Sequence, residues 1–375
     1  LVDDYLAPLA AHPAIAPHLR LGASVVAISR QGFDRVRTTG RDSAAFELRL
    51  SDGTDLLASA VIDASGTWRT PNRVGGDGLQ AHGERDAIVA GRIFDGMPDV
   101  LGTQRSHFAG RRVAVVGAGH SATGTLLSLA ELAATEPGTS VSWLLRAPDP
   151  RRAYGGGDAD ALPARGAIGT RVRGLVEVGA VTVHTNFLVR EITDDSLVSA
   201  DGRKVGADVV VNATGARPDH AITAELRLDL DPVLGATRTL APLIDPNVHS
   251  CGTVPPHGVD ELAHPEPGFY VVGSKSYGRA PTFLLATGYE QARSVVAALA
   301  GDWDAARDVR LELPETGVCS SSLADASDTA DAACCGSPVA VPAGQGLATG
   351  VAGGLVALPL LTVERAGSGS GSCCG

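Results

Sequence analysis

The chain has 375 residues, enough for two domains with cores of their own, and its 44% hydrophobic and 19% charged residues are ordinary for a globular protein. The formal net charge of −11 argues against a nucleic-acid partner, because such partners need a basic surface. Six cysteines without a C-x-x-C spacing exclude a secreted disulfide framework, so we expect a cytoplasmic protein.

The first third of the chain predicts a helix within residues 1–20 and then a series of short strands. The strand candidates are SVVAIS, FDRVRTT, AFELRL and LLASAVIDASG. Their spacing of about 8–12 residues, with polar and apolar residues alternating in FELRL, favours an antiparallel meander. The last run enters a tight glycine turn at Ser65 and Gly66.

The stretch from Arg111 to Ala133 predicts a buried parallel strand (RVAVV), a glycine turn and a helix over about Ser121–Thr135. The sequence GAGHSA fits the pattern G-x-G-x-x-G/A, in which the first glycine permits the turn and the second admits a pyrophosphate. The free N–H groups of the helix then face the phosphates. A tight turn without a ligand is the alternative. The candidate contacts are Gly117, Gly119, His120, Ser121 and Ala122.

The next strand, VSWLL, is followed by Arg146. An NAD enzyme places Asp or Glu here for the ribose 2′-hydroxyl, whereas arginine suits a 2′-phosphate. We therefore expect NADPH rather than NADH, with a solvated surface arginine as the alternative.

The later strands are predicted at VVVNATG and YVVG, and a helix at PTFLLATGYEQARSVVAALAGD. Residues 319–375 are rich in Ala, Gly and Ser, which is typical of a flexible tail. The uncharged run at 332–363 contains six glycines and three prolines, so we expect no membrane span.

Four stretches together carry a family resemblance: VIDASGTWRTPN, FAGRRVAVVGAGHSATG, DVVVNATGARPDH and YVVGSKSYGRAPTFLLATGYEQARSV. With them, the chain resembles the two-dinucleotide-domain flavoproteins near the flavin-containing monooxygenases and thioredoxin reductases. It resembles most the monooxygenase-like flavoproteins of arsenic-resistance operons. The resemblance covers about residues 1–302 and implies an α/β fold with two Rossmann-like domains that bind FAD and NADPH.

The resemblance also implies a domain organisation. Residues 1–105 match the later part of the first FAD-domain segment with its meander, residues 106–220 the inserted NADPH domain, and residues 221–302 the return to the FAD domain. Residues 303–375 are left as a flexible cysteine-containing tail. The family's FAD fingerprint would precede Leu1, so we expect an N-terminally truncated chain.

The family's turns imply cofactor contacts at Ser65, Gly66, Thr214 and Gly215. The return strand of the family often ends in Gly-Asp, whereas here it ends in Gly273–Ser274, so that FAD contact is weaker or made otherwise. The monooxygenase fingerprint begins at Phe94 but lacks its histidine and aromatic residue. The absence of C-x-x-C excludes disulfide exchange through a core cysteine pair.

The stretch SKSYGRAPTF is the candidate for the flavin chemistry. Lys275 and Arg279 would stabilise anionic reduced flavin, Tyr277 would stack on the ring, and Pro281 and Thr282 would begin a helix whose dipole faces the flavin. The alternative is an ordinary helix start with solvated basic residues.

Cysteine pairs in the tail are a candidate site for trivalent arsenic or mercuric ion, since thiolates select soft ions, with a third ligand from the other pair or from Cys319. A compositional accident is the alternative. The histidines around Cys251, which are His249, His257 and His264, are candidates for lining a substrate pocket or binding a soft metal. Their spacing fits no common zinc pattern, so a surface loop is the favoured interpretation. The paired cysteines are Cys334, Cys335, Cys373 and Cys374.

The sequence thus predicts an FAD-dependent, NADPH-oxidising oxidoreductase. The expected step is monooxygenase-like, with a small-molecule substrate and oxygen. The alternatives are a flavin-dependent metal or metalloid reductase and a non-catalytic protein whose thiol tail binds a metalloid. A homodimer is a further expectation.

Overall fold

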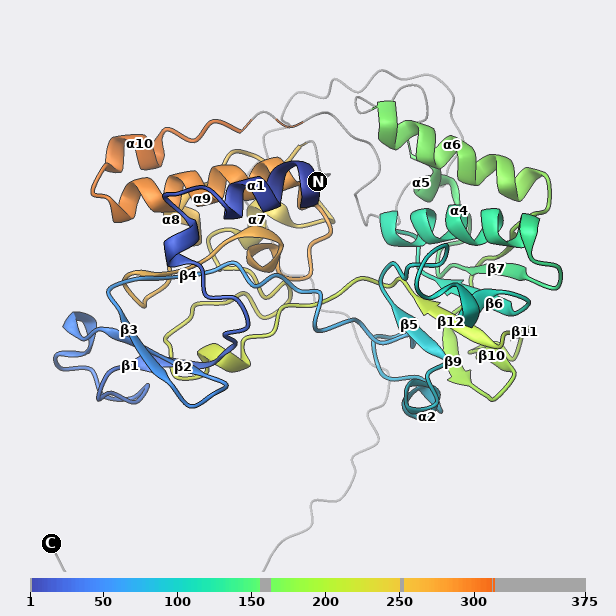
Figure 1. Ribbon diagram of the computed structural model, residues 1–375, viewed down its shortest axis with the longest axis horizontal. Helices are drawn as coiled ribbons and strands as arrows, with labels where there is room; N and C mark the ends of the chain where they lie inside the picture. Colours follow the sequence, from blue (N-terminus) through green and yellow to red (C-terminus); the bar gives the residue numbers. More distant parts are fainter. Residues whose placement is uncertain (1, 156–162, 250–252, 312, 314–375) are drawn as a thin grey trace, which may run out of the picture. The chain divides into compact units, whose positions relative to one another are not determined.

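The computed structural model describes residues 2–155, 163–249, 253–311 and 313 (Figure 1). The candidate metalloid ligands, from Cys319 to Cys374, and Cys251 lie outside these residues. Within the described part, no helix is long and apolar enough to cross a membrane.

A five-stranded parallel sheet forms the centre of one half (Figure 1), in the order β5 (Ile93–Asp95), β12 (Val209–Asn212), β6 (Arg112–Val116), β7 (Ser140–Leu144) and β8 (Thr182–His184). The helices α4 (His120–Thr135) and α6 (Pro163–Glu177) connect β6 to β7 and β7 to β8. The apolar runs RVAVV and VVVN suit this sheet, because parallel strands are buried on both faces. The helix and both strands predicted around the glycine turn are confirmed.

Successive residues of β6 face different cores. Val113 and Val115 pack into the core that includes α4, whereas Ala114 and Val116 pack into a second core on the opposite side of the strand. A short meander, β9 (Val189–Ile192), β10 (Ser196–Ser199) and β11 (Lys204–Gly206), contributes to this second core.

The other half contains the predicted antiparallel meander, formed by β1 (Val25–Arg30), β2 (Phe46–Leu50) and β3 (Asp55–Ala58). The strand predicted at FDRVRTT is wrong: Asp34–Thr39 contain no strand. In a parallel pair, β4 (Val61–Asp63) lies beside β13 (Phe269–Val271). The helices α9 (Leu285–Leu299) and α10 (Trp303–Arg307) follow β13.

The remaining elements are short. They are η1 (Val2–Leu6), α1 (Ala7–Ala10), η2 (Ala16–His18), η3 (Arg41–Ser43), α2 (Glu84–Val89), α3 (Arg105–Phe108), α5 (Arg151–Tyr154), η5 (Ala221–Thr223), α7 (Ala241–Ile244), α8 (Val259–Leu262) and η6 (Gly273–Tyr277).

The chain crosses between the two halves twice, and the two crossings pair with each other. Pro71 and Ala216 form an antiparallel bridge. The Asn72 N–H donates to the carbonyl of Gly215 at 2.9 Å, and the Arg217 N–H donates to the carbonyl of Thr70 at 2.9 Å. The backbone N–H and carbonyl groups of each crossing are thus hydrogen-bonded to the other crossing instead of to water.

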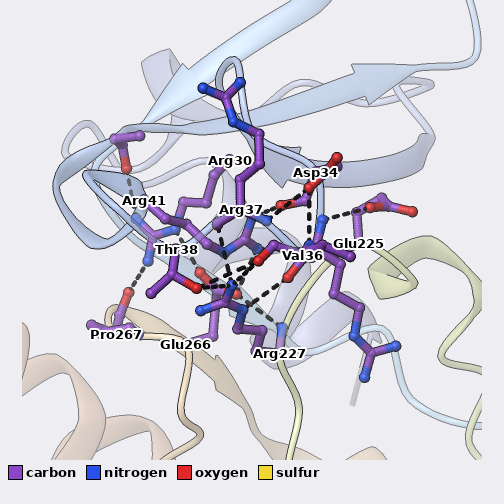
Figure 2. A network of polar contacts seen from close by, with 12 residues as sticks. Arg30, Asp34, Val36, Arg37, Thr38, Arg41, Glu225, Arg227, Glu266 and Pro267 are labelled. Atoms are coloured by element: carbon purple, nitrogen blue, oxygen red, sulfur yellow. Dashed lines mark hydrogen bonds and ion pairs between the residues drawn. The ribbon is translucent and has the colours of Figure 1, made fainter. Parts of the chain in front are cut away.

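A buried carboxylate, Glu266, explains why FDRVRTT is a loop (Figure 2). Its oxygens accept bonds from Arg30 Nε at 2.7 Å and from Arg41 Nη2 at 2.9 Å, and all three side chains are at most 3% exposed. Arg41 also donates to the carbonyl of Asp34 at 2.6 Å, and Arg227 donates to the carbonyls of residues 35–37. These guanidinium groups donate hydrogen bonds to the carbonyl oxygens of the loop. In a strand, the same oxygens would have to accept hydrogen bonds from a neighbouring strand.

The charge balance of this cluster depends on Glu266. Burial opposes ionisation of the carboxyl group, but the bonds from the backbone N–H of Arg227 and from Arg30 and Arg41 outweigh it and hold the pKa of Glu266 below its usual value.

We expect Glu266→Gln to lower the free energy of unfolding by about 3 kcal/mol or more, because two buried guanidinium groups lose their counter-charge. Urea unfolding measures the change. The control is Glu47→Gln, which removes the exposed pair with Arg49 at 3.4 Å and should cost less than about 1 kcal/mol. Equal losses in the two variants would contradict the assigned role of Glu266.

Candidate functional site

The glycine turn after β6 is fixed from two sides. Gly117 has φ +129°, and a Cβ atom there would lie 2.2 Å from the carbonyl oxygen of Ala213, so only glycine fits. On the other side, the indole of Trp143 donates to the carbonyl oxygen of Gly117 at 2.7 Å. Trp143 is fully buried, and the sequence did not single it out because VSWLL is equally consistent with a plain apolar strand.

The space in front of α4 fits a pyrophosphate. Gly119 is extended, with φ −82° and ψ −178°, and a Cβ atom there would meet no heavy atom within 4 Å. His120 and Ser121 begin the 16-residue helix and are exposed, whereas Ala122 is buried and permits close packing. The first-turn N–H groups of this helix therefore face open space, as an anion site requires.

Arg146 lies two residues beyond β7, at the carboxyl edge of the sheet. Its side chain is exposed and donates to the carbonyl oxygen of Gly76 at 3.4 Å. This long bond leaves the guanidinium accessible to a phosphate, which it can bind through two parallel bonds.

The turns after β4 and β13 lie together, although sequence reasoning named their residues only as separate candidate contacts. Parallel strands end at the same edge, and a Cβ atom at Gly66 would lie 3.6 Å from Ser274 Oγ. A Cβ atom at Gly273, which has φ +73°, would meet no heavy atom within 4 Å. Ser65, Gly66, Gly273 and Ser274 thus form one open glycine-rich edge that suits a second dinucleotide.

Thr214 and Gly215 have a different environment. The Thr214 hydroxyl donates to Asn212 Oδ1 at 2.7 Å, and the Thr214 carbonyl accepts a bond from Asn72 Nδ2 at 3.0 Å. Together with the bond from Asn72 to Gly215, these contacts place both residues in the paired crossings.

Lys275 forms a buried ion pair with Asp63. The distance from Nζ to Oδ2 is 2.7 Å, both side chains are 2% exposed, and Nζ also lies 3.2 Å from Ser65 Oγ. Burial opposes ionisation of Asp63, but the bonds from Lys275 and Ser65 prevail and lower the pKa of the carboxyl group. The ammonium group therefore joins η6 to the turn after β4, whereas the sequence assigned it to the flavin.

Asp63 is the site residue that sequence reasoning missed. The signal was a carboxylate directly after the apolar residues Val61 and Ile62, since a charge at the buried end of a strand needs a partner. Ser65 also donates to Asp63 Oδ1, at 2.6 Å from its hydroxyl and 3.0 Å from its N–H.

Tyr277 lies inside the core, where we expected a residue that stacks on the flavin. Its side chain is fully buried, burial raises the pKa of its hydroxyl, and that hydroxyl lies 3.3 Å from His257 Nε2. Gln291 Nε2 also lies 3.2 Å from His257 Nε2, and Gln291 Oε1 accepts the N–H of Gly273 at 2.8 Å. Tyr277, the last residue of η6, therefore anchors this segment in the core through its contact with His257.

His257 is neutral in this network, and the surface-loop interpretation is wrong for it. Its ring is buried, which lowers the pKa of His257. If Nδ1 carries the proton, it donates to the carbonyl of Pro255 at 2.9 Å, and Nε2 accepts bonds from Tyr277 and Gln291. Protonation of Nε2 would remove that acceptor.

The helix start predicted at Pro281 and Thr282 is wrong, because α9 begins at Leu285. Leu284 is extended, with φ −118° and ψ 151°, so the helix cannot include it. Thr282 is buried and its hydroxyl donates to the carbonyl of Ile244 at 3.3 Å, whereas Arg279 is exposed. Among the described residues, no group of three or more metal-ligating side chains occurs.

The chain thus has two parallel pairings of strands with glycine turns at their carboxyl ends, the arrangement at which α/β folds bind dinucleotides. Residues 16–259 match the family described as pyridine nucleotide-disulphide oxidoreductase. The chain belongs to this family, whose cofactors are FAD and NAD(P)H.

A ferredoxin–NADP reductase of Gluconobacter oxydans is 37% identical over 134 residues, which are 33% of this chain and 35% of that protein. The match thus spans about a third of the relative. The bacillithiol disulfide reductase of Bacillus cereus has a TM-score of 0.55 and 18% identity, covering 80% of this chain and 76% of that chain. The Staphylococcus aureus enzyme has a TM-score of 0.50 and 16% identity, covering 74% and 70%. At such identities the structures support the fold alone.

The two glycines of the turn should respond differently to alanine. Gly117→Ala should lower the free energy of unfolding by about 2 kcal/mol or more, because both the positive φ and the contact with Ala213 oppose a methyl group. Gly119→Ala should change stability by less than about 0.5 kcal/mol yet weaken NADP⁺ binding about 10-fold, because its methyl group fills the space of the pyrophosphate. Urea unfolding and calorimetric titration check these results. Unchanged NADP⁺ affinity in Gly119→Ala would refute the assignment.

Stability should fall as the pH drops below about 6.5. Burial lowers the pKa of His220 and His257 from 6.5 and that of His264 to about 4, so the unfolded chain binds more protons in this range. The stabilisation is complete above the unfolded pKa and decreases by about 1.4 kcal/mol per pH unit for each histidine that is charged only when unfolded.

Urea unfolding across this range measures the slope. His264→Gln should reduce the slope, and the exposed His18→Gln should leave it unchanged. A flat profile between about pH 7 and pH 5 would show that these rings are accessible to protons in the folded state.

Proposed function

We propose that the chain oxidises NADPH through FAD and delivers the electrons to an acceptor other than a cysteine pair of its own fold. The observation that carries this proposal is the accessible Arg146 at the carboxyl edge of the sheet, beside the glycine turn. The sequence also contains no C-x-x-C.

When bound, FAD accepts hydride from NADPH and passes on the electrons. The residues of this chain bind and orient the reactants. The N-terminus of α4 and Gly119 receive the pyrophosphate, and Arg146 binds the 2′-phosphate. The Asp63–Lys275 pair holds the turn at Ser65 and Gly66 beside that at Gly273, so that the second dinucleotide meets a fixed edge.

Two acceptors remain as candidates. Oxygen with a small-molecule substrate is supported by the sequence resemblance to monooxygenase-like flavoproteins: one oxygen atom enters the substrate, the other leaves as water, and NADPH supplies both electrons. A reductase step on a redox protein is supported by the ferredoxin–NADP reductase that is 37% identical over 134 residues. A metalloid acceptor is supported only by the sequence resemblance to flavoproteins of arsenic-resistance operons. Oxygen uptake per NADPH separates them, because only the first consumes oxygen stoichiometrically with substrate oxidation.

Replacing Arg146 by Gln should reduce the preference for NADPH over NADH, measured as the ratio of kcat/KM values, by about 10-fold or more, because charged bonds to the 2′-phosphate are lost. NADPH oxidation by FAD-loaded protein with menadione as acceptor measures the ratio. Arg171→Gln on α6 removes the same charge from another exposed position and should not change it. Equal kcat/KM for both nucleotides in the unmodified protein would disprove the assignment.

A further inference from the structure

Three arginines from separate segments meet at the paired crossings. Arg73 follows Asn72 on the first crossing, and its carbonyl accepts the Thr214 hydroxyl at 3.5 Å. On the second crossing, Arg217 Nε donates to Asn72 Oδ1 at 3.2 Å, beside its backbone bond to Thr70. The pairing of the two crossings therefore brings two guanidinium groups onto one short ribbon.

The turn at Leu234–Gly235 contacts both Arg279 and the second crossing. The Arg279 N–H donates to the carbonyl of Leu234 at 2.8 Å. A Cβ atom at Gly235 would lie 3.3 Å from Pro218, the neighbour of Arg217. A Cβ atom at Gly278, which has φ +60°, would lie 2.0 Å from the Leu234 oxygen, so glycine is required for this close approach.

The three guanidinium groups have no ion-pair partner in the part of the chain that the structure describes. No carboxylate oxygen of these residues lies within 4.0 Å of Arg73, Arg217 or Arg279. Burial and the charges of Arg279 and Arg73 lower the pKa of Arg217, but arginine stays protonated in proteins. Arg30 and Arg41, by contrast, share the buried carboxylate of Glu266. The three arginines thus create a region of positive electrostatic potential that favours the binding of an anion.

We propose that Arg73, Arg217 and Arg279 receive a carboxylate or oxyanion group of the electron acceptor. This inference rests on the proposed function and adds the chemical class of the acceptor. Both anionic parts of NADPH have other candidate partners, in α4 and Arg146. Arg279 lies two residues after η6, the segment that carries Gly273 and Ser274, so the anion would lie close to the second glycine-rich edge.

A pair of octahedral acceptors with opposite charges tests the proposal. Ferricyanide is an anion and hexaammineruthenium(III) a cation, and each NADPH reduces two of either ion and releases one proton. With FAD-loaded protein, Arg73→Gln and Arg217→Gln should each raise the KM for ferricyanide about 10-fold, since a charged bond is lost, and leave the kinetics with the ruthenium complex unchanged.

Two control variants separate charge from structure. Arg217→Lys should keep most of the affinity for ferricyanide, because it retains the positive charge. Arg171→Gln on α6 should have no effect. If the KM for ferricyanide is unchanged in Arg73→Gln and Arg217→Gln, the proposal is overturned.

A second measurement does not depend on turnover. Phenylglyoxal modifies accessible arginines, and peptide mass spectrometry locates the modified ones. Ferrocyanide should protect Arg73 and Arg217 in the FAD-loaded protein, and NADP⁺ should not. Protection by NADP⁺ alone, or lack of reaction before ferrocyanide is added, would assign the cluster to a cofactor and overturn the proposal. Failure to reduce either acceptor, with ferrocyanide protection intact, would refute the proposed function while supporting the anion site.

Discussion

The ion pair between Asp63 and Lys275 sets the geometry of the glycine-rich edge formed by Ser65, Gly66, Gly273 and Ser274. Two ions taken out of water are costly unless each compensates the other, so the end of β4 and the start of η6 must stay at bonding distance, 2.7 Å. Ser65 is bonded to the same carboxylate, and Gly66 lies against Ser274. The turns are therefore fixed through a pair of charges rather than through apolar contact alone.

The polar network beneath η6 extends this constraint into the core. Gln291 on α9 accepts the N–H of Gly273 and contacts His257, which in turn contacts Tyr277. Each polar atom of the network has a partner only if His257 is neutral. The glycine turn of the other half has no such network: it is held by its close approach to Ala213 and by the indole of Trp143. The two glycine-rich edges are thus stabilised differently, one by a titratable network and the other by close packing and an aromatic side chain.

Sequence reasoning succeeded where the determinants are local. The strand, turn and helix around Gly117 follow from hydrophobic period and glycine spacing within about 25 residues, and the meander follows from alternation. Sequence reasoning failed where the local structure depends on residues that are far away along the chain. Lys275 is 212 positions from Asp63, and Arg41 is 225 positions from Glu266, so no local pattern could reveal that one lysine is buried or that FDRVRTT is a loop. The start of α9 was misplaced because a proline can also begin a helix.

The paired crossings have a consequence for how this architecture can be taken apart. Between Asn72 and Gly215 the chain makes one long excursion, builds the five-stranded sheet, and returns to within 2.9 Å of where it left. A segment whose two ends lie side by side is topologically an insertion into the rest of the chain. A short linker could therefore replace it without moving the residues on either side. The same connectivity would let another module take its place while the strand pairing in the rest of the chain is unchanged.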